Sequence, residues 1–156
     1  MELKHLRDQI DTLDFQLLKM LDKRMEIALR LRRYKTHVED KAREVEVMDH
    51  FKNFPNTLFS KEFSEKILNE ILRESKRVQK RNQKLIGFQG EHGAYSEIAA
   101  RAFNNDQIYI PFREFREVIE GVETGSIDLG IVPVENSLGG AVTEVNDLLI
   151  KSGLRI

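Results

Sequence analysis

The first 54 residues contain neither glycine nor proline, and this feature most limits what the chain can fold into. Glycine and proline are the residues that interrupt helices, so a stretch of this length without them strongly favours long helices. All nine glycines lie at or after Gly87, and the first proline is Pro55. We therefore expect two segments of different local structure, residues 1–84 and 85–156.

Three helices are predicted in residues 1–84, over about Leu3–Lys35, Lys41–Asn53 and from Ser60 to about Lys84. The first helix would be roughly 48 Å long, and a small three-helix domain does not cover a rod of that length. Its apolar residues recur at helical spacing, so they predict an intertwined homodimer in which a second copy covers them. They are Leu3, Leu6, Ile10, Leu13, Leu17, Leu21, Ala28 and Leu31. In the second helix, Val45, Met48 and Phe51 are expected to face inward.

Short apolar runs alternate with helical stretches in residues 85–156, which is typical of a parallel α/β unit. The expected order is a strand from Leu85, a glycine-rich turn, a helix from about Tyr95, and a strand at Ile108–Ile110. A helix at Phe115–Glu123 and a buried strand at Leu129–Pro133 follow.

The composition excludes several kinds of protein. A charged fraction of 33% with a hydrophobic fraction of 40% indicates a soluble globular chain, and no apolar run approaches the roughly 20 residues of a membrane span. The absence of cysteine excludes disulfides and thiolate chemistry. The N-terminus is charged and lacks a secretory signal, so a cytoplasmic protein is expected.

The two segments carry opposite charge. Residues 1–84 hold 20 Lys and Arg against 15 Asp and Glu, whereas residues 85–156 hold 5 against 11. A basic helical segment is compatible with an anionic ligand, with nucleic acid or with an ordinary solvated surface.

Polar residues continue the apolar stripe of the third helix. Ser75 and Gln79 share one helix face, and buried polar groups are costly unless they are hydrogen-bonded, so they indicate either a polar cavity or a frayed helix end. Arg24 and Lys35 are three turns apart on one face of the first helix, about 16 Å along its axis. Arg7 points about 100° elsewhere, so it reaches the same site only from a partner helix.

These residues resemble the AroQ-type chorismate mutases, all-helical enzymes that form intertwined dimers. The resemblance rests on Leu6-Arg7-Asp8-Gln9-Ile10-Asp11-Thr12-Leu13-Asp14, Leu17-Leu18, Leu21, Lys23-Arg24, Lys35, Asp40-x-x-Arg43-Glu44 and Ser75-x-x-x-Gln79. It implies a unimolecular rearrangement of chorismate to prephenate without metal or cofactor.

The resemblance also implies a role for each matching residue. Arg24, with Arg7 from the other subunit, would bind the two carboxylates of chorismate. Lys35 and Gln79 would donate hydrogen bonds to the ether oxygen. Around them, Arg43 would extend the cationic lining, Glu44 would orient the substrate hydroxyl, and Ser75 would contact a carboxylate. Asp40 would assist Glu44, although an Asp before a helix is equally what an N-cap requires.

Two motifs stand out in residues 85–156, namely Gly90-x-x-Gly93-x-Tyr95-Ser96 and Pro133-x-Glu135-Asn136-Ser137. With them, this segment is similar to the first part of the prephenate dehydratases. The resemblance implies one lobe of a periplasmic-binding-protein-like domain, with Ser96, Asn136 and Ser137 as prephenate contacts and His92 as an incidental loop residue. The Thr-Arg-Phe catalytic motif of that family does not occur, so we expect an incomplete domain without dehydratase turnover.

Two other functions fit parts of the sequence. A helical dimerisation module would explain the long apolar stripe but not the polar residues that continue it. A nucleic-acid interface would use the basic cluster Lys76, Arg77, Lys80, Arg81 and Lys84, which has no interleaved aromatic residues.

Overall fold

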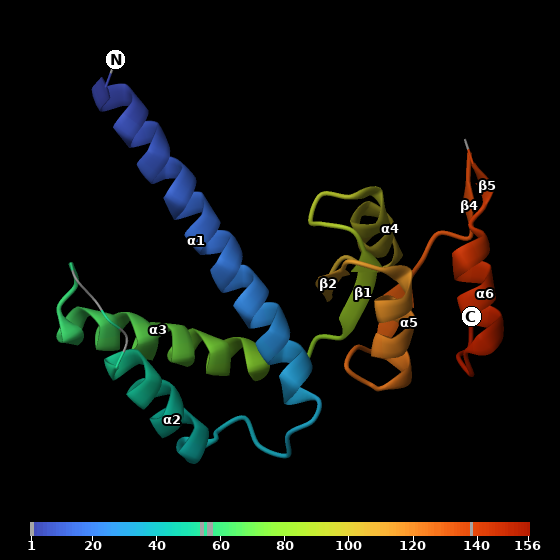
Figure 1. Cartoon of the computed structure of the whole chain (residues 1–156). Helices are drawn as coiled ribbons and strands as arrows, with labels where there is room; N and C mark the ends of the chain where they lie inside the picture. Colours follow the sequence, from blue (N-terminus) through green and yellow to red (C-terminus); the bar gives the residue numbers. More distant parts are fainter. Residues whose placement is uncertain (1, 54, 56–57, 138) are drawn as a thin grey trace. The chain divides into compact units, whose positions relative to one another are not determined.

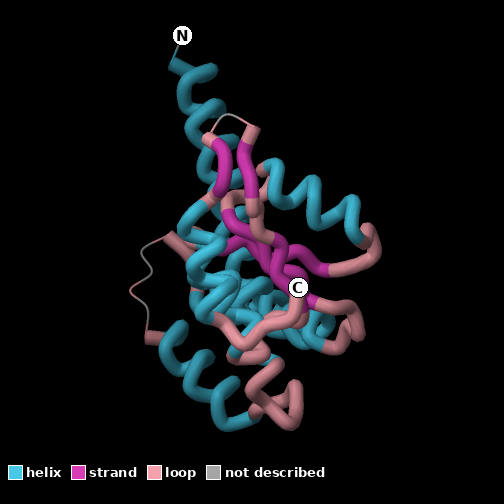
Figure 2. Tube along the Cα trace, turned by 90° about the vertical axis from the view of Figure 1, so that its right-hand side faces the viewer, coloured by secondary structure: helices cyan, strands magenta, loops and turns pink. Residues whose placement is uncertain are grey.

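The computed structural model describes residues 2–53, 55, 58–137 and 139–156. The chain divides into two compact units, Met1–Arg81 and Asn82–Ile156. Among the described residues, the strands drawn in magenta in Figure 2 all belong to the second unit, whereas the first is helical. The sequence therefore forms a helical unit followed by a unit with a small parallel sheet.

Three helices make up the first unit: α1 (Glu2–Arg32), α2 (Lys41–Lys52) and α3 (Lys61–Gln79). Helix α3 packs against both α1 and α2. Its N-cap is Ser60, whose side chain accepts a hydrogen bond from the backbone N–H of Phe63 at 3.1 Å. The N-cap of α2 is Asp40, which accepts from the Arg43 N–H at 3.0 Å. Both helices thus begin where a side-chain acceptor satisfies an N–H group of the first turn.

Two helices end earlier than their sequence pattern predicts. After α1 the chain tightens, with the N–H of Lys35 bonded to the carbonyl of Arg32 at 3.2 Å, so Lys35 lies on a turn and not on the helix. After α3 ends, Lys84, which was predicted to lie in the third helix, donates a hydrogen bond from its backbone N–H to the Gln107 side chain at 2.7 Å. The turn after α1 and the hydrogen bond of Lys84 after α3 accompany these two helix ends. Neither can be predicted from the local spacing of apolar residues.

Much apolar surface of the helical unit faces solvent in a single chain. Figure 1 shows α1 extending well past α2 and α3. Along its stripe, Leu3, Ile10 and Leu13 are 57–64% exposed. Of the three residues predicted to face inward on α2, Met48 is half-buried, but the prediction is wrong for Val45 and Phe51, which are 61% and 42% exposed. The inward-facing residues of α2 include Glu44 and Val47, which line a cavity against the other helices.

The second unit is built on a parallel sheet in the order β2-β1-β3. The strands are β1 (Leu85–Gln89), β2 (Ile108–Phe112) and β3 (Leu129–Ile131), joined through α4 (Tyr95–Phe103) and α5 (Phe115–Glu123). Strand β1 is central, with four of its five residues buried. The connection through α4 runs from β1 to β2, and the connection through α5 runs back in the opposite direction, from β2 past β1 to β3. Because parallel connections are right-handed, the two helices cover opposite faces of the sheet.

Alternate residues of β1 face α4 on one side of the sheet and α5 on the other. Ile86 and Phe88 pack with Ala100 of α4 on one face. Gly87 points to the other face, where a Cβ atom would lie 2.4 Å from the Cδ1 atom of Ile127 and 2.9 Å from the ring of Phe112. The α5 side of the sheet is therefore packed so closely that position 87 has no room for a side chain.

Part of the second unit differs from expectation. Strand β3 is shorter than predicted and only partly buried, since it lies at the edge of the sheet. The short antiparallel pair β4 (Glu135–Asn136) and β5 (Gly140–Ala141) was not predicted, and neither was α6 (Thr143–Lys151), which packs against α5. In the part of the chain that the structure describes, no helix is long and apolar enough to cross a membrane.

Candidate active site

A cavity of about 250 Å³ lies among the three helices of the first unit. It gathers residues from α1, from the loop that follows it, from the start of α2 and from the end of α3. Seven of the residues predicted from the sequence line it: Arg24, Lys35, Asp40, Arg43, Glu44, Ser75 and Gln79. The remainder of the lining is apolar apart from Lys76, so the cavity combines polar and apolar walls, as many small-molecule sites do.

Arg24 is the most unusual residue of this cavity. Its Nη1 atom is buried and has no hydrogen-bond partner among the described residues. Burial lowers the pKa of the Arg24 guanidinium, because desolvation disfavours its charged form, yet arginine remains protonated at neutral pH. A buried N–H donor without a partner costs stability, and an anion placed in the cavity would supply an acceptor for it.

Lys35 and Asp40 form an ion pair at the cavity. The Nζ atom of Lys35 lies 3.6 Å from Oδ2 of Asp40, and the two side chains are 25% and 44% exposed. The other carboxylate oxygen of Asp40 caps α2. Asp40 is therefore both the N-cap of α2 and part of the cavity lining.

Ser75 and Gln79 lie on α3 and face the cavity together. Ser75 is 6% exposed, so the stripe that continues into polar residues remains inside the unit. The Gln79 Nε2 atom donates to both the hydroxyl and the carbonyl oxygen of Ser75, each at 3.1 Å. These contacts favour the polar cavity over a frayed helix end at this position.

The first turn of α2 brings Arg43 and Glu44 to the cavity, but both are engaged by other residues. An Nη1 atom of Arg43 bonds to Glu46 at 2.9 Å, on the exposed side of α2. The carboxylate of Glu44 accepts from Nζ of Lys76 at 2.8 Å. Lys76 was predicted only as part of a basic surface cluster. It follows Leu72 by four residues, and this helical spacing from an inward residue was the signal for its position.

The charge of the lining suits a dianion. Four cationic side chains (Arg24, Lys35, Arg43 and Lys76) stand against the two carboxylates of Asp40 and Glu44, a net charge of +2. Carboxylate ligands form strong charge-assisted hydrogen bonds with such groups.

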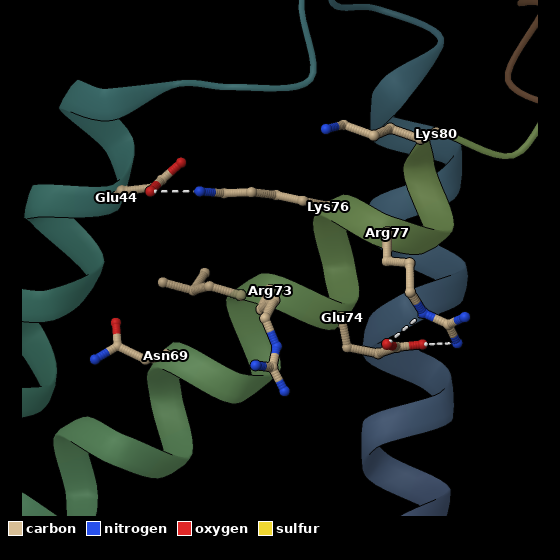
Figure 3. Close-up of a pocket in the computed structure, with 8 residues that line it drawn as sticks. Glu44, Asn69, Arg73, Glu74, Lys76, Arg77 and Lys80 are labelled. Carbon is tan, nitrogen blue, oxygen red and sulfur yellow. Dashed lines mark hydrogen bonds and ion pairs between the residues drawn. The ribbon is translucent and has the colours of Figure 1, made fainter.

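A second, more open hollow of about 700 Å³ adjoins this cavity along α3 (Figure 3). Its lining is basic, but the cations are largely paired. Arg77 bonds to Glu74 through two nitrogen atoms at 2.7 Å, and Arg73 pairs with Glu70. Counted together with Glu70, the lining of the hollow still carries a net charge of +1, against +2 for the cavity.

Four of the predicted residues lie outside the cavity. Arg7 is exposed in the second turn of α1. In the second unit, Ser96 lies in the first turn of α4, Asn136 in β4 and Ser137 directly after it. The segments that carry them follow the carboxyl ends of β1 and β3, and ligands of open α/β sheets bind at that edge where the strand order reverses.

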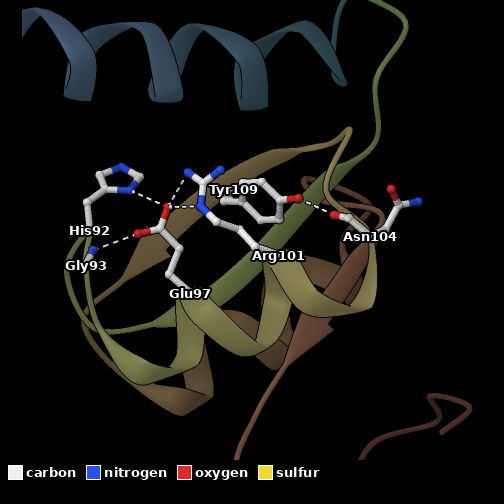
Figure 4. A network of polar contacts seen from close by, with 6 residues as sticks. All are labelled: His92, Gly93, Glu97, Arg101, Asn104 and Tyr109. Atoms are coloured by element: carbon white, nitrogen blue, oxygen red, sulfur yellow. Dashed lines mark hydrogen bonds and ion pairs between the residues drawn. The ribbon is translucent and has the colours of Figure 1, made fainter.

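A polar network fixes the turn between β1 and α4 (Figure 4). Glu97 is 5% exposed and accepts hydrogen bonds from the Gly93 N–H at 2.7 Å and from Arg101 at 2.6 and 3.0 Å. Nδ1 of His92 lies 3.2 Å from the same carboxylate. Burial raises the pKa of Glu97, but the hydrogen bonds from Gly93, Arg101 and His92 outweigh it, so the pKa lies below its usual value. His92 thus helps to hold the loop.

Two family models match the chain and together cover nearly all of it. The chorismate mutase type II model matches residues 6–80, and the prephenate dehydratase model matches residues 86–156. Residues 6–80 belong to the chorismate mutase type II family, and residues 86–156 to the prephenate dehydratase family. The cavity therefore lies wholly within the mutase-family segment, and Ser96, Asn136 and Ser137 lie within the dehydratase-family segment.

Individual relatives show both segments in one protein. The chain is 29% identical over 164 residues to the bifunctional chorismate mutase/prephenate dehydratase of Aquifex aeolicus, an alignment that covers 99% of this chain and 45% of the relative. It is also 29% identical to the bifunctional chorismate mutase/prephenate dehydratase of Escherichia coli, over 97% of this chain and 44% of the relative.

The dehydratase-family segment also matches plant proteins. It is 42% identical over 72 residues to arogenate dehydratase/prephenate dehydratase 2 of Arabidopsis thaliana, with 46% of this chain and 19% of the relative covered. The chain spans about 45% of the length of the bifunctional relatives it matches. In the part of the chain that the structure describes, no group of three or more His, Asp or Glu residues is arranged to hold a metal ion.

Proposed function

We propose that residues 1–84 are a chorismate mutase domain that converts chorismate to prephenate in the cavity of the helical unit. The observation that carries the proposal is the buried, unpartnered Nη1 atom of Arg24 in a lining of net charge +2. A dicarboxylate substrate fits this arrangement because it supplies an acceptor for Arg24 and balances the charge.

The chemistry needs few protein groups. The rearrangement is a unimolecular pericyclic step, so the protein has to hold the flexible substrate in its reactive conformation and stabilise charge as the C–O bond breaks. Arg24 would bind a carboxylate, and Ser75 would contact it. Lys35 and Gln79 would donate to the ether oxygen, which gains negative charge in the transition state. Glu44, with Asp40 beside it, would orient the hydroxyl.

The site is proposed to be completed by a second copy of the chain. Arg7 is far from the cavity along α1, and the apolar stripe of the same helix is exposed. A homodimer formed through α1 would cover the stripe and supply the partner's Arg7 as the second carboxylate ligand, with Arg43 extending the cationic lining.

Residues 85–156 are proposed to be part of a prephenate dehydratase domain of the periplasmic-binding-protein type. Ser96, Asn136 and Ser137 would contact prephenate from this lobe, at the edge where β1 and β3 end. The proposal also places the protein in the cytoplasm, in keeping with its lack of cysteine.

A direct assay tests the mutase proposal. Chorismate is added to the purified chain and its ultraviolet absorbance is followed, with prephenate identified as the product by chromatography. Catalysed loss of chorismate that saturates with substrate is the expected result. Absence of catalysis, in a protein shown to be folded by circular dichroism, would refute the assignment.

A further inference from the structure

Lys76 makes the ion pair that joins α3 to α2 at the cavity. Its Nζ atom lies 2.8 Å from Oε2 of Glu44, a residue 32 positions away in the sequence. The two side chains are 33% and 31% exposed. The pairs that Arg73 and Arg77 form are of a different kind, since each links residues three apart on α3 and involves more exposed side chains. Partly buried pairs are less screened by solvent than surface pairs.

The ion pair between Lys76 and Glu44 also lies where the cavity and the hollow adjoin. Glu44, Leu72 and Lys76 line both the cavity of about 250 Å³ and the adjoining open hollow. Figure 3 shows the Lys76 side chain extending from α3 to the carboxylate of Glu44 on α2. The pair is therefore part of the wall between the cavity and the hollow.

A carboxylate in this wall creates an electrostatic problem for an anionic ligand. Glu44 is unfavourable beside a dianion unless a cation offsets its charge, because like charges repel strongly at partly buried sites. Without Lys76 the net charge of the lining falls from +2 to +1, and Glu44 loses the one bond that its carboxylate oxygens make among the described residues.

We propose that Lys76 is a positioning residue of the mutase site: it holds the Glu44 carboxylate in the wall of the cavity and offsets its charge, so that a dianionic substrate binds beside it. The inference rests on the proposed function and adds to it a residue that acts through Glu44. Because Lys76 acts on binding, its loss raises KM more than it lowers kcat.

The test compares Lys76→Met with Arg77→Met in the full chain. Arg77→Met removes a neighbouring cation of the same helix whose partner, Glu74, does not line the cavity. For Lys76→Met we expect KM for chorismate to rise about tenfold, since one partner of a partly buried charge pair is left alone. For Arg77→Met we expect KM within about twofold of the unaltered chain, because exposed ion pairs contribute little.

Two further variants separate positioning from general stability. Lys76→Arg keeps a cation in reach of Glu44, and we expect it to restore KM to within about threefold. In a Glu44→Gln background there is no carboxylate to offset, so adding Lys76→Met should change KM by less than about twofold. Thermal unfolding of each variant shows whether it is folded.

The outcomes distinguish failure of the proposed function from failure of the inference about Lys76. If the unaltered chain does not turn over chorismate, the proposed function fails and this inference falls with it. If the unaltered chain is active and folded Lys76→Met keeps its KM, the inference alone is wrong. An equal rise in KM for Lys76→Met with and without Glu44→Gln would show that Lys76 acts independently of Glu44, and would also overturn it.

Discussion

Arg24 shows how a single residue links the fold to the proposed chemistry. One nitrogen atom of its guanidinium is buried at the cavity and has no partner among the described residues, and an unsatisfied buried donor lowers the stability of the folded chain. Such local cost is typical of groups that are arranged in advance for a ligand. An anion that binds Arg24 is expected to stabilise the folded chain by mass action.

Lys35 gives the first prediction at the residue scale. Lys35→Ala removes the proposed donor to the ether oxygen, and loss of one donor to developing negative charge typically lowers turnover by at least about a hundredfold. Steady-state kinetics with chorismate measures the change, and light scattering checks that the oligomeric state is unaltered. Near-normal kcat in the variant would contradict the assigned role.

Glu97 gives a second prediction, about stability and pH. Its pKa is lower in the folded protein than in the unfolded chain, so its contribution is present above about pH 4.3 and is lost as the pH falls through the folded value. Glu97→Gln should destabilise the protein by roughly 1–3 kcal/mol at pH 7, because a buried hydrogen-bonded carboxylate is replaced.

Thermal unfolding over a pH series measures this effect. The curves of Glu97→Gln and the unaltered chain should approach each other below pH 4, whereas Glu120→Gln, on the exposed face of α5, should match the unaltered chain throughout. A constant difference between the Glu97→Gln curve and that of the unaltered chain, from pH 7 to pH 3, would show that the charge of Glu97 is not the cause.

The sequence predicts the residues of the cavity better than their contacts. Helical spacing places Ser75 and Gln79 on one inward face, and both line the cavity. It does not predict that Lys35 leaves the helix on a tight turn, or that Lys76 reaches Glu44. Those features depend on hydrogen bonds and ion pairs formed after the helices pack, which one-dimensional periodicity does not contain.

At the scale of elements, the apolar stripe of α1 is the basis for the proposed homodimer. The stripe is largely exposed in a single chain, and exposed apolar surfaces of this kind are typical of interfaces. We predict that Ile10→Glu, which places a charge on the stripe, yields a monomer with mutase activity reduced at least about tenfold, because the partner's Arg7 is lost. Size-exclusion chromatography with light scattering measures the mass.

Lys4→Glu is the matched control for this change. By helical spacing Lys4 lies on the far side of α1 from the stripe, so the same introduced charge should leave the mass and the activity unaltered. A monomeric unaltered chain at micromolar concentration would remove the partner's Arg7 from the proposed site, whatever the behaviour of the variants.

Elements with strong local signals match their prediction most closely. Helix α5 spans Phe115–Glu123 as predicted, since its apolar face is regular and Glu114 and Glu117 form a capping box at its start. Helix α6 was missed because the sequence around it offers no side-chain cap and its start, after Val142, has no typical N-cap residue. Strand β3 was predicted too long, because its apolar run continues past the point where pairing with β1 ends.

At the scale of the whole molecule, two family segments follow each other in one chain, and each has its own core. The dehydratase-family segment lacks the Thr-Arg-Phe motif. We therefore predict that the chain rearranges chorismate but does not convert prephenate to phenylpyruvate. Incubation with prephenate and detection of phenylpyruvate by its enolate absorbance is the measurement, and turnover above the uncatalysed rate would disprove it.

The paired bonds between Gln79 and Ser75 have a consequence for selectivity. Both N–H groups of the amide are already used inside the empty cavity, so a substrate oxygen that recruits Gln79 exchanges one neutral hydrogen bond for another and gains little. The exchange becomes favourable when the acceptor carries more negative charge than a hydroxyl or carbonyl. Gln79 would then discriminate in favour of the bond-breaking state over the resting substrate, which is the condition for raising kcat.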